Sequence, residues 1–532
     1  METSVVFTKC EHHDVNPSSK KAIKGGWKSA IFIIFVEFGE RFAYYGVSGN
    51  LIMYLTIVMK QPLASAATNV NLWHGVSALF PIVGGFVADS YFGRFKTIVF
   101  SSLTYLLVGL VLLVISAEAI PLKHRLVPFF VALYVINIGE GGHRPCIQTF
   151  AADQFDDEEK AAKSSFFNWW YLGIVIGATT SILVVVTVQD NIGYGWGFAI
   201  PAIVVALALG VFLYGKSTYR RQVPIGSPFT KVGQVIVAAF RKRRLLLENG
   251  WGMFNVEKQE ETGDTMIQSL ARTNQFRFLD KAALIDETDV SSGKSNHWRL
   301  CTVNQVEQVK LLIRLIPIWL SCLMFAVVIA QLTTFYTKQA STLVRTIGST
   351  KFQVPPASLQ VLPGLTILTA VPLYERFLIP TARRLTGHPT GITVLQRIGV
   401  GIFFSMVTMI VSALVESKRV GVATQQGLLD NPKSTIPMSV WWVVPQYILM
   451  GVSDVFTIVG LQELFYDQVP EEMRSMGAAA YLSVVGVGSF MSSALISVIQ
   501  VITARRGDEW LKGDNLNRAH LDYFYWVLAF KR

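Results

Sequence analysis

The stretch FVEFGERFAYYG (residues 35–46) lies within an apolar run that extends over residues 30–59. It contains Glu37, Glu40 and Arg41, although charged side chains inside a membrane are costly and rare. A run of this length can cross a bilayer as a helix, since about 20 residues suffice. Their spacings of three and four residues place the charges on one helix face. The stretch therefore predicts a membrane-spanning helix whose charged face is turned into a bundle of other helices.

The composition extends this prediction to the whole chain. Of the 532 residues, 51% are hydrophobic and 16% are charged, and the mean hydropathy is +0.42. Long apolar runs recur from end to end, which predicts an all-α membrane protein with many spans. The net charge of +11 arises from Lys and Arg in loops, as the positive-inside rule expects. The basic residues do not interleave with aromatic ones on a soluble domain, so the sequence does not favour nucleic-acid binding.

Apolar windows predict two sets of spans on either side of a long polar stretch. The first set lies near residues 28–58, 71–91, 97–117, 127–150, 165–188 and 194–214. The second set lies near residues 307–337, 355–380, 392–415, 438–465 and 474–503. A last apolar stretch begins at Leu521 and is shorter than the ~20 residues that a span needs. We therefore expect a cytoplasmic N-terminal tail (1–27), a six-helix bundle (28–214), a cytoplasmic linker (215–306) and a second bundle (307–532) with five full spans and a truncated twelfth.

Basic segments indicate the orientation of these spans. The segments GRFK (93–96), RKRR (241–244) and ERFLIPTARRLTGH (375–388) fall on the same side as the Lys-rich N-terminus. The positive-inside rule places that side in the cytoplasm. The N-terminus lacks the apolar core and cleavage site of a secretory signal, so the first span is expected to direct insertion. Two six-span halves joined by a cytoplasmic linker are typical of secondary transporters, which bind their solutes between the halves.

The loop between the second and third spans carries a recognisable pattern. Gly85, Asp89, Gly93 and Arg94 match the signature G-x-x-x-D-x-x-x-G-R. This signature resembles that of the major facilitator superfamily, and it implies that superfamily's fold of two six-helix halves around a central cavity. Gly93 permits a tight turn, and Asp89 can accept hydrogen bonds from exposed N–H groups or pair with a cation. We interpret these residues as a brace of the gate rather than as ligands of the solute.

The charges of the first span are interpreted as a proton-binding device. Glu37 and Glu40 cannot both ionise cheaply in a medium of low dielectric constant, so one is expected to take up a proton while Arg41 stabilises the other. The alternative is a static ion pair, which would need only one acid. Tyr45 follows Arg41 by one turn and is the best candidate for an aromatic residue that lines the cavity.

Two further charges lie at similar depth in opposite halves. Arg144 lies in the fourth span and Asp454 in the tenth, each about sixteen or seventeen residues from the outer end of its helix. A salt bridge between them would hold the cytoplasmic side shut. Alternatively, each charge is satisfied within its own half. Glu140 and His143 lie next to Arg144 and are interpreted as hydrogen-bonding neighbours.

Charged residues also open the seventh span. Glu307, Lys310 and Arg314 share one helix face near the cytoplasm because they are spaced by three and seven residues. An ion pair at the start of the helix is the simpler interpretation. Glu307 and Lys310 are nevertheless retained as candidates for gating or for lining the cavity.

Nothing in the sequence points to an enzyme or to a cofactor. The four cysteines are scattered without metal-ligand or disulfide spacing. The sequence shows no pairing of a nucleophile with a base, and the linker carries no catalytic motif. We therefore expect no metal, no cofactor and no catalytic residue.

Several motifs together resemble the plant nitrate/peptide transporter family, a branch of the proton-coupled oligopeptide transporters. The motifs are EFGERFAYYG (37–46), with the family's E-x-x-E-R-F signature, GGHRPCIQTFAADQFD (141–156), FFNWWY (166–171) and GLQELFYDQVPEEMRS (460–475). The likeness extends from Trp27 to the C-terminus and is strongest to the fifth subfamily. It implies twelve spans, alternating access and proton symport, with proton coupling at the Glu and Arg residues of the first span.

The chain departs from the family pattern at certain positions. The resemblance implies a lysine where this chain has Arg144 and a glutamate where it has Asp454, so a bridge would keep its signs with altered reach. The family's best-known nitrate transporter uses a histidine where this chain has Ile329, which excludes a nitrate site built on that histidine. Thr97 matches a position that is phosphorylated in that transporter, which implies a regulatory kinase as a partner. The C-terminus ends before a twelfth span is complete.

The sequence as a whole predicts a proton-coupled symporter for a small solute, with nitrate or di- and tripeptides first. The protein is expected in the plasma membrane or the vacuolar membrane of a plant, with protons, solute and lipid as its partners. The alternative is a transporter-like sensor, or an inactive truncated paralogue, that binds a ligand without moving it. The incomplete last span and Thr97 motivate this alternative.

Overall fold

We analysed a computed structural model of the chain. It describes residues 25–155, 160–221, 228–245, 254, 272–286, 289, 296–346, 353–387, 392–432, 434–468, 474–507, 510–511, 513 and 515–530. All statements about the structure below refer to these residues.

The N-terminal bundle (residues 27–217) consists of long helices, several of which contain a π-helical or 3-10 segment. In chain order, its elements are α1 (Trp27–Ser48), α2 (Leu51–Met53), η1 (Tyr54–Val58), α3 (Leu63–Val87), η2 (Ala88–Phe92), α4 (Arg94–Leu103), η3 (Thr104–Leu110), α5 (Val111–Glu118), α6 (Leu122–Ala152), α7 (Lys160–Asn191), α8 (Tyr194–Tyr214) and η4 (Gly215–Ser217).

The linker contributes α9 (Pro228–Arg241) and η5 (Arg277–Ala283). The C-terminal bundle (residues 303–530) follows. Its elements are α11 (Val303–Arg314), α12 (Ile316–Ser321), α13 (Leu323–Ile329), η6 (Leu332–Tyr336), α14 (Thr337–Ser341), β1 (Leu343–Val344), η7 (Pro356–Gln360), α15 (Val361–Leu373), η8 (Tyr374–Leu378), α16 (Ile379–Thr386), α17 (Val394–Gln425), β2 (Ile436–Ser439), η9 (Val440–Val443), α18 (Val444–Asp467), α19 (Arg474–Arg505), η11 (Leu516–Arg518) and α20 (Leu521–Phe530).

Length and hydropathy identify the helices that can cross a membrane. Among the described residues, nine helices are long and apolar enough, or ten if the pair Val303–Ser321 and Leu323–Ser341, bent by 49°, forms one span. Helix α1 is not among them, because every window of bilayer length within it contains Glu37, Glu40 and Arg41. Helix α20 is apolar but only ten residues long. The chain is therefore a multi-pass, helical membrane protein.

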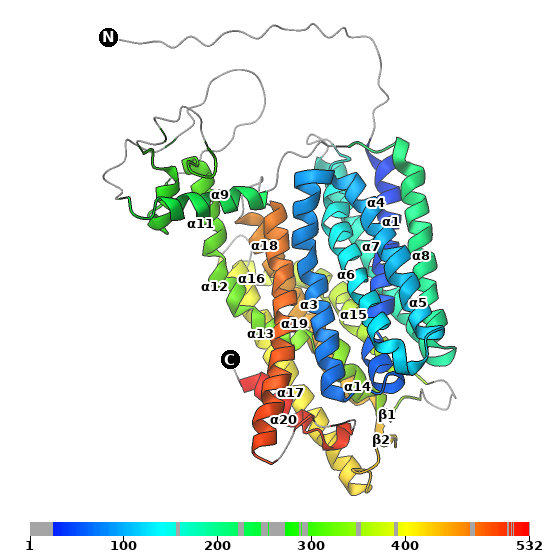
Figure 1. The fold of residues 1–532 in the computed structure, drawn as a ribbon. Helices are drawn as coiled ribbons and strands as arrows, with labels where there is room; N and C mark the ends of the chain where they lie inside the picture. The colour runs from blue at the N-terminus through cyan, green and yellow to red at the C-terminus, as the bar shows by residue number, and fades with distance from the viewer. Residues whose placement is uncertain are drawn as a thin grey trace, which may run out of the picture.

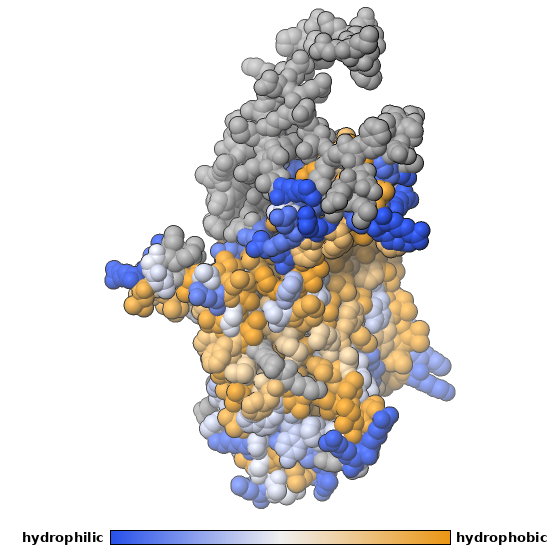
Figure 2. Space-filling model, turned by 90° about the vertical axis from the view of Figure 1, so that its left-hand side faces the viewer, coloured by the Kyte–Doolittle hydropathy of each residue, from blue (hydrophilic) through white to orange (hydrophobic). Residues whose placement is uncertain are grey.

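The two bundles stand side by side, and the linker helix α9 lies together with α11, the first helix of the C-terminal bundle, at one end (Figure 1). We call this end the linker face and the opposite end, near α20 and the strands, the far face. Figure 2 shows a broad apolar band between hydrophilic residues at the two ends. This band is the surface that a bilayer would cover, since its hydrocarbon core accepts apolar side chains and excludes charged ones.

The fold is all-helical as expected, apart from one short pair of strands on the far face. Strands β1 and β2 pair in parallel, with Leu343 opposite Ile436 and Val344 opposite Ser439. The pairing joins the segment after α14 to the segment before η9. Backbone groups at a helix end need partners, and this short ladder supplies them outside the apolar band.

Small residues allow the helices to approach closely. A Cβ added at Gly84 in α3 would lie 2.1 Å from the carbonyl oxygen of Gly141 in α6. A Cβ at Gly75 in α3 would lie 2.7 Å from the ring of Phe490 in α19. Glycine at such contacts is the usual means of packing membrane helices. Helix α3 therefore packs against its own bundle on one side and against the other bundle on the other.

Hydrogen bonds join the two bundles towards the far face. The amide of Gln360 donates to the carbonyl oxygen of Gly49 at 2.8 Å. The amide of Asn71 donates to the hydroxyl of Ser492 at 3.0 Å, and Lys338 donates to the hydroxyl of Thr56 at 3.1 Å. In this conformation the halves are tied together at the far face.

Candidate functional site

The charged face of α1 is buried in the N-terminal bundle. The side chains of Glu37, Glu40 and Arg41 are each 3% exposed. Arg41 Nε lies 3.4 Å from Glu37 Oε1, and both Nε and Nη2 of Arg41 contact Glu40 Oε2. One guanidinium therefore holds both carboxylates, as their shared helix face requires.

A third carboxylate, Glu140 in α6, completes this cluster. Its side chain has no exposed area, and its Oε1 lies 3.4 Å from Nη2 of Arg41 and 3.1 Å from Nη1 of Arg144. The hydroxyl of Ser77 in α3 donates to Glu140 Oε2 at 2.6 Å. Glu140 thus connects the charges of α1 with Arg144, although the sequence suggested only a hydrogen-bonding neighbour.

Aromatic residues close one side of the cluster. The guanidinium carbons of Arg41 and Arg144 lie 5.3 Å and 5.5 Å from the centre of the Tyr44 ring. The Tyr44 hydroxyl forms a 2.8 Å hydrogen bond with Nδ1 of His74, and its ring stacks on Trp73. A ring face attracts cations, so Tyr44 interacts with both guanidinium groups of the cluster.

The cluster combines three carboxylates with two guanidinium groups. Oxygen Oε2 of Glu37 and Oε1 of Glu40 are buried, and neither has a hydrogen-bond partner among the described residues. Buried acceptors without partners are costly, and a protonated carboxyl group would turn one of them into a donor. One bound proton would also balance the three negative charges against the two positive ones. The arrangement can therefore bind a proton.

Arg144 and Asp454 do not form an ion pair with each other in this conformation. Arg144 pairs with Glu140 within its own bundle, and its side chain is 24% exposed. Asp454 in α18 has a buried Oδ1 with no hydrogen-bond partner among the described residues. Arg144 is therefore paired within its own half, whereas Asp454 has one oxygen without a partner among the described residues.

Tyr45 and Ile329 pack among apolar side chains. Tyr45 packs beside a group of apolar residues of α7 and α15 that includes Ile182 and Val361. Its ring meets the Tyr44 ring edge-on. Ile329 ends α13 and packs against the large apolar core. Of the two tyrosines, Tyr44 is the one whose ring lies within cation–π distance of Arg41.

Glu307 and Lys310 connect α11 to the linker. Nζ of Lys310 lies 2.5 Å from Asp280 Oδ1 in η5 and 2.7 Å from Glu307 Oε1. Both side chains are almost fully buried, and Thr273 donates to Glu307 Oε2 at 2.8 Å. This is the ion pair at a helix start that the spacing suggested, extended by linker residues, and it lies at the linker face.

The loop signature forms a turn with a cross-helix ion pair. Gly93 has φ +78°, a conformation that favours glycine, and Gly85 faces Pro145 of α6. Nη1 of Arg94 lies 2.5 Å from Oδ2 of Asp153. The side chain of Asp89 lies outside the described part.

Thr97, the proposed phosphorylation site, is 6% exposed. Its hydroxyl donates to the carbonyl oxygen of Gly93 at 3.0 Å. This conformation therefore does not present the hydroxyl to a kinase. Over the described ranges, no group of three His, Cys, Asp or Glu side chains could hold a metal ion.

Comparison with known proteins assigns the chain to a family. A sequence profile of the POT family matches residues 95–511. This chain belongs to the POT family. Protein NRT1/PTR FAMILY 5.4 of Arabidopsis thaliana is 53% identical over 517 residues, which cover 96% of this chain and 92% of the relative. Protein NRT1/PTR FAMILY 5.10 of the same plant is 46% identical over 531 residues, which cover 97% and 92%.

Solved structures of POT family transporters share the fold. An auto-inhibited POT family peptide transporter superposes with a TM-score of 0.69 at 21% identity, covering 95% of this chain and 96% of that one. A POT family transporter in complex with 5-aminolevulinic acid gives 0.65 at 15% identity, covering 96% of each chain. The identity to the two Arabidopsis relatives confirms the resemblance to the nitrate/peptide transporter family and its fifth subfamily. Membership places the chain among transporters rather than enzymes.

Proposed function

We propose that this POT family member is a proton-coupled symporter that moves a small solute, nitrate or a di- or tripeptide, by alternating access. The observation that supports it best is the buried cluster of Glu37, Glu40, Glu140, Arg41 and Arg144. A structural ion pair would need one acid for each base. Here the acids outnumber the bases, and two of their oxygens lack partners among the described residues.

The proton would act on the pairing of Arg41. Protonation of Glu37 or Glu40 removes one of the negative charges that hold this guanidinium. Arg41 would then be freer to attract an anionic group of the solute. Solute binding can shift the balance between conformations only as far as its affinity for them differs. In this mechanism, proton and solute therefore bind more tightly together than apart.

The gate would switch the partner of Arg144. In the conformation described here, Arg144 pairs with Glu140, and the bundles are joined at the far face. We infer that in the opposite conformation Arg144 leaves Glu140 for Asp454, whose Oδ1 lacks a partner here. That bridge would close the linker face, which we assign to the cytoplasm, and both charges would keep a partner in one state or the other.

Uptake measurements test the proposal. Labelled nitrate and a labelled dipeptide are offered to oocytes that display the chain, at acidic and at neutral external pH. We expect acid to stimulate uptake of one of them. In Glu40→Gln the cluster is neutral without a proton, so the stimulation should disappear while solute exchange persists. Proton-driven accumulation in this variant would refute the assignment. Detection of the chain in plasma-membrane or in vacuolar fractions of plant cells would establish which of the two membranes holds the protein.

A further inference from the structure

A cavity of about 940 Å³ lies between the two bundles at the far face. The N-terminal bundle contributes Lys60 and Asp190, and the C-terminal bundle contributes Lys338, Arg345 and Asn517. Lys60 and Asp190 are exposed, so solvent reaches the cavity. None of the charged residues around Arg41 lines it. The volume lies in the range of small-molecule sites, about 300–1,000 Å³.

The charge of the lining is mainly positive. Its described residues include three cations, Lys60, Lys338 and Arg345, and one carboxylate, Asp190. The amide of Asn50 donates to Asp190 Oδ1 at 2.9 Å. A concave surface with one dominant sign of charge concentrates ions of the opposite sign. The cavity thus favours anions over cations.

Arg345 is the cation of this lining with the clearest capacity for a ligand. It lies in the loop after β1, outside the spans. Its contacts are to uncharged oxygens, the Val354 carbonyl at 3.2 Å and Gln353 Oε1 at 3.4 Å. Burial lowers the pKa of the Arg345 guanidinium, and Asp190 opposes this shift. A guanidinium has five N–H donors in a planar fork that matches the oxygens of nitrate or a carboxylate.

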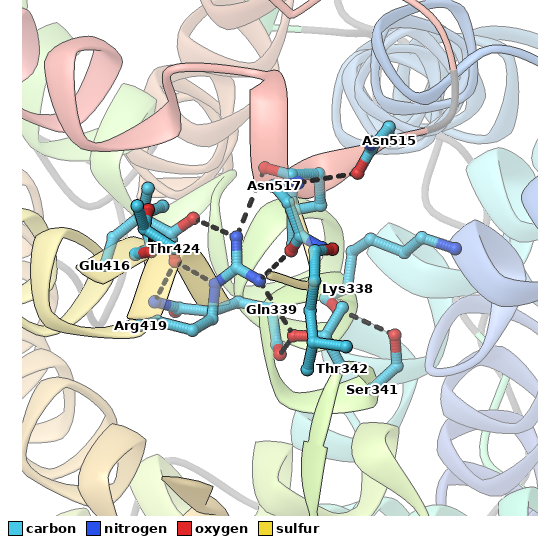
Figure 3. Close-up of polar contacts among 12 residues, drawn as sticks. Lys338, Gln339, Ser341, Thr342, Glu416, Arg419, Thr424, Asn515 and Asn517 are labelled. Atoms are coloured by element: carbon cyan, nitrogen blue, oxygen red, sulfur yellow. Dashed lines mark hydrogen bonds and ion pairs between the residues drawn. The ribbon is translucent and has the colours of Figure 1, made fainter. Parts of the chain in front are cut away.

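A buried network holds the C-terminal wall of the cavity in place (Figure 3). Arg419 and Glu416 have no exposed side-chain area, and Arg419 Nη2 lies 2.6 Å from Glu416 Oε1. Nη1 of Arg419 donates to Asn517 Oδ1 at 2.7 Å and to the Thr342 hydroxyl at 3.3 Å. Both acceptors line the cavity. The wall is therefore positioned before any ligand arrives.

Lys338 points away from this network towards the N-terminal bundle (Figure 3), where its Nζ donates to Thr56. A positive wall thus spans the boundary between the halves. We propose that this cavity is a binding site for a small anion, nitrate or the carboxylate of a short peptide, which it holds at the far face on the way to or from the central cluster. The inference rests on the proposed transport function for the identity of the solute, and it adds a second place, apart from Arg41, at which the anionic group of the solute is held.

The site can be tested without transport. A reporter variant carries Thr435→Cys, an exposed lining position, in a Cys10→Ser background, because the other three cysteines are buried. The purified full chain is labelled with an anionic and with a cationic methanethiosulfonate reagent. We divide the rate of the anionic reagent by the rate of the cationic one and normalise this ratio to its value for a free thiol. The normalised ratio should exceed one. Lys338→Gln and Arg345→Gln should each lower it about threefold or more, given Coulomb interactions across a cavity of this size.

Controls separate a local effect from misfolding. Lys418 lies on α17 with its Nζ 3.3 Å from the centre of the Trp442 ring, and it does not line the cavity. Lys418→Gln should leave the ratio unchanged. Lys60→Gln, at an exposed lining position, should lower the ratio even if the variants at the half-buried Lys338 and Arg345 fold poorly. A ratio near one, or a ratio that none of the lining variants changes, would overturn the inference.

Occupancy is distinguished from simple attraction by competing salts. Sodium nitrate or sodium acetate, whose anions have the planar oxygens that a guanidinium fork matches, should slow the anionic reagent at lower concentration than sodium chloride of equal ionic strength. Arg345→Gln should abolish the difference. Equal effects of all three salts in the reporter would show screening without a site and would refute binding. Labelling needs no uptake, so the two proposals can fail separately. Nitrate binding without transport would refute the proposed function and support the site. Proton-coupled uptake together with a labelling ratio near one would support the proposed function and refute the site.

Discussion

Glu140→Gln is the substitution that tests the central cluster most directly. The glutamine keeps the shape of the side chain and can still accept a hydrogen bond from Ser77, but it removes the charge that faces Arg41 and Arg144. At an effective dielectric constant of about 20, attraction over the observed 3.1 Å and 3.4 Å is worth about 5 kcal/mol for each contact. Much of this offsets the cost of keeping a carboxylate out of water.

The net effect should be smaller than the gross attraction. The substitution also relieves repulsion from Glu37 and Glu40, so we expect a loss of about 3 kcal/mol, the lower end of what breaking a buried pair costs. With an unfolding entropy of roughly 2 cal/mol/K per residue, a chain of this length loses about 3 °C of melting temperature. Heating the detergent-purified protein and measuring the fraction that stays monodisperse gives this midpoint.

Two further variants make the measurement decisive. Ser77→Ala removes only the 2.6 Å hydrogen bond and should cost about 1 kcal/mol. In the double variant Glu140→Gln, Arg144→Gln, neither partner is left unpaired. We therefore expect it to be more stable than Glu140→Gln alone. If the double variant is no more stable than Glu140→Gln alone, the argument from unpaired charge is refuted.

Other predictions concern packing, a second buried pair and the linker. Gly84→Ala should prevent purification of a monodisperse protein, because its Cβ would lie 2.1 Å from a backbone oxygen. Gly210→Ala, whose Cβ would have nothing within 4 Å, should behave as the wild type. Equal behaviour of the two variants on gel filtration would contradict the packing. Arg419→Met should cost about 3–5 kcal/mol in the same thermal assay, since it leaves Glu416 buried and unpaired; a change below about 1 kcal/mol, the usual range for surface positions, would contradict it. Burial raises the pKa of the Cys301 thiol to about 11. In a chain that keeps only this cysteine, the rate of maleimide labelling should therefore rise at a higher pH than the rate for a free thiol does. A rise at the same pH as for a free thiol would show that the linker core is open.

The sequence predicts the helices and the first three site residues for physical reasons. Apolar windows of bilayer length locate the long helices, because a membrane requires both length and hydropathy. The shared face of Glu37, Glu40 and Arg41 follows from helix geometry alone. Their mutual contacts needed no knowledge of the remaining chain.

The rest of the cluster depends on contacts between distant parts of the chain. Glu140 reaches Arg41 from 99 residues away, and no periodicity within one helix shows which of its charges meets another helix. Tyr44 and Tyr45 both follow Arg41 by about one turn, so spacing cannot choose between them. The choice is made by packing, since Tyr44 contacts Trp73 of α3 and Tyr45 lies beside α7 and α15.

The bridge between Arg144 and Asp454 could not be judged from sequence for a different reason. It belongs to one conformation of a protein that is expected to have at least two. Charges of opposite sign at equal depth indicate that two residues can meet, but not in which state. The structure shows a state in which Arg144 pairs with Glu140.

The clamp at Lys310 has a mechanical consequence. Lys310 joins Glu307 of α11 to Asp280 of η5, and an apolar core that includes Val235, Leu279 and Val306 continues from the linker into the start of the seventh span. The linker elements α9 and η5 are therefore attached to the C-terminal bundle both by an ion pair and by an apolar core. When the two halves rock against each other, α9 must travel with the second half. A fluorophore attached to α9 would read out the angle of that half as directly as one placed inside the membrane, without disturbing any helix in the bilayer.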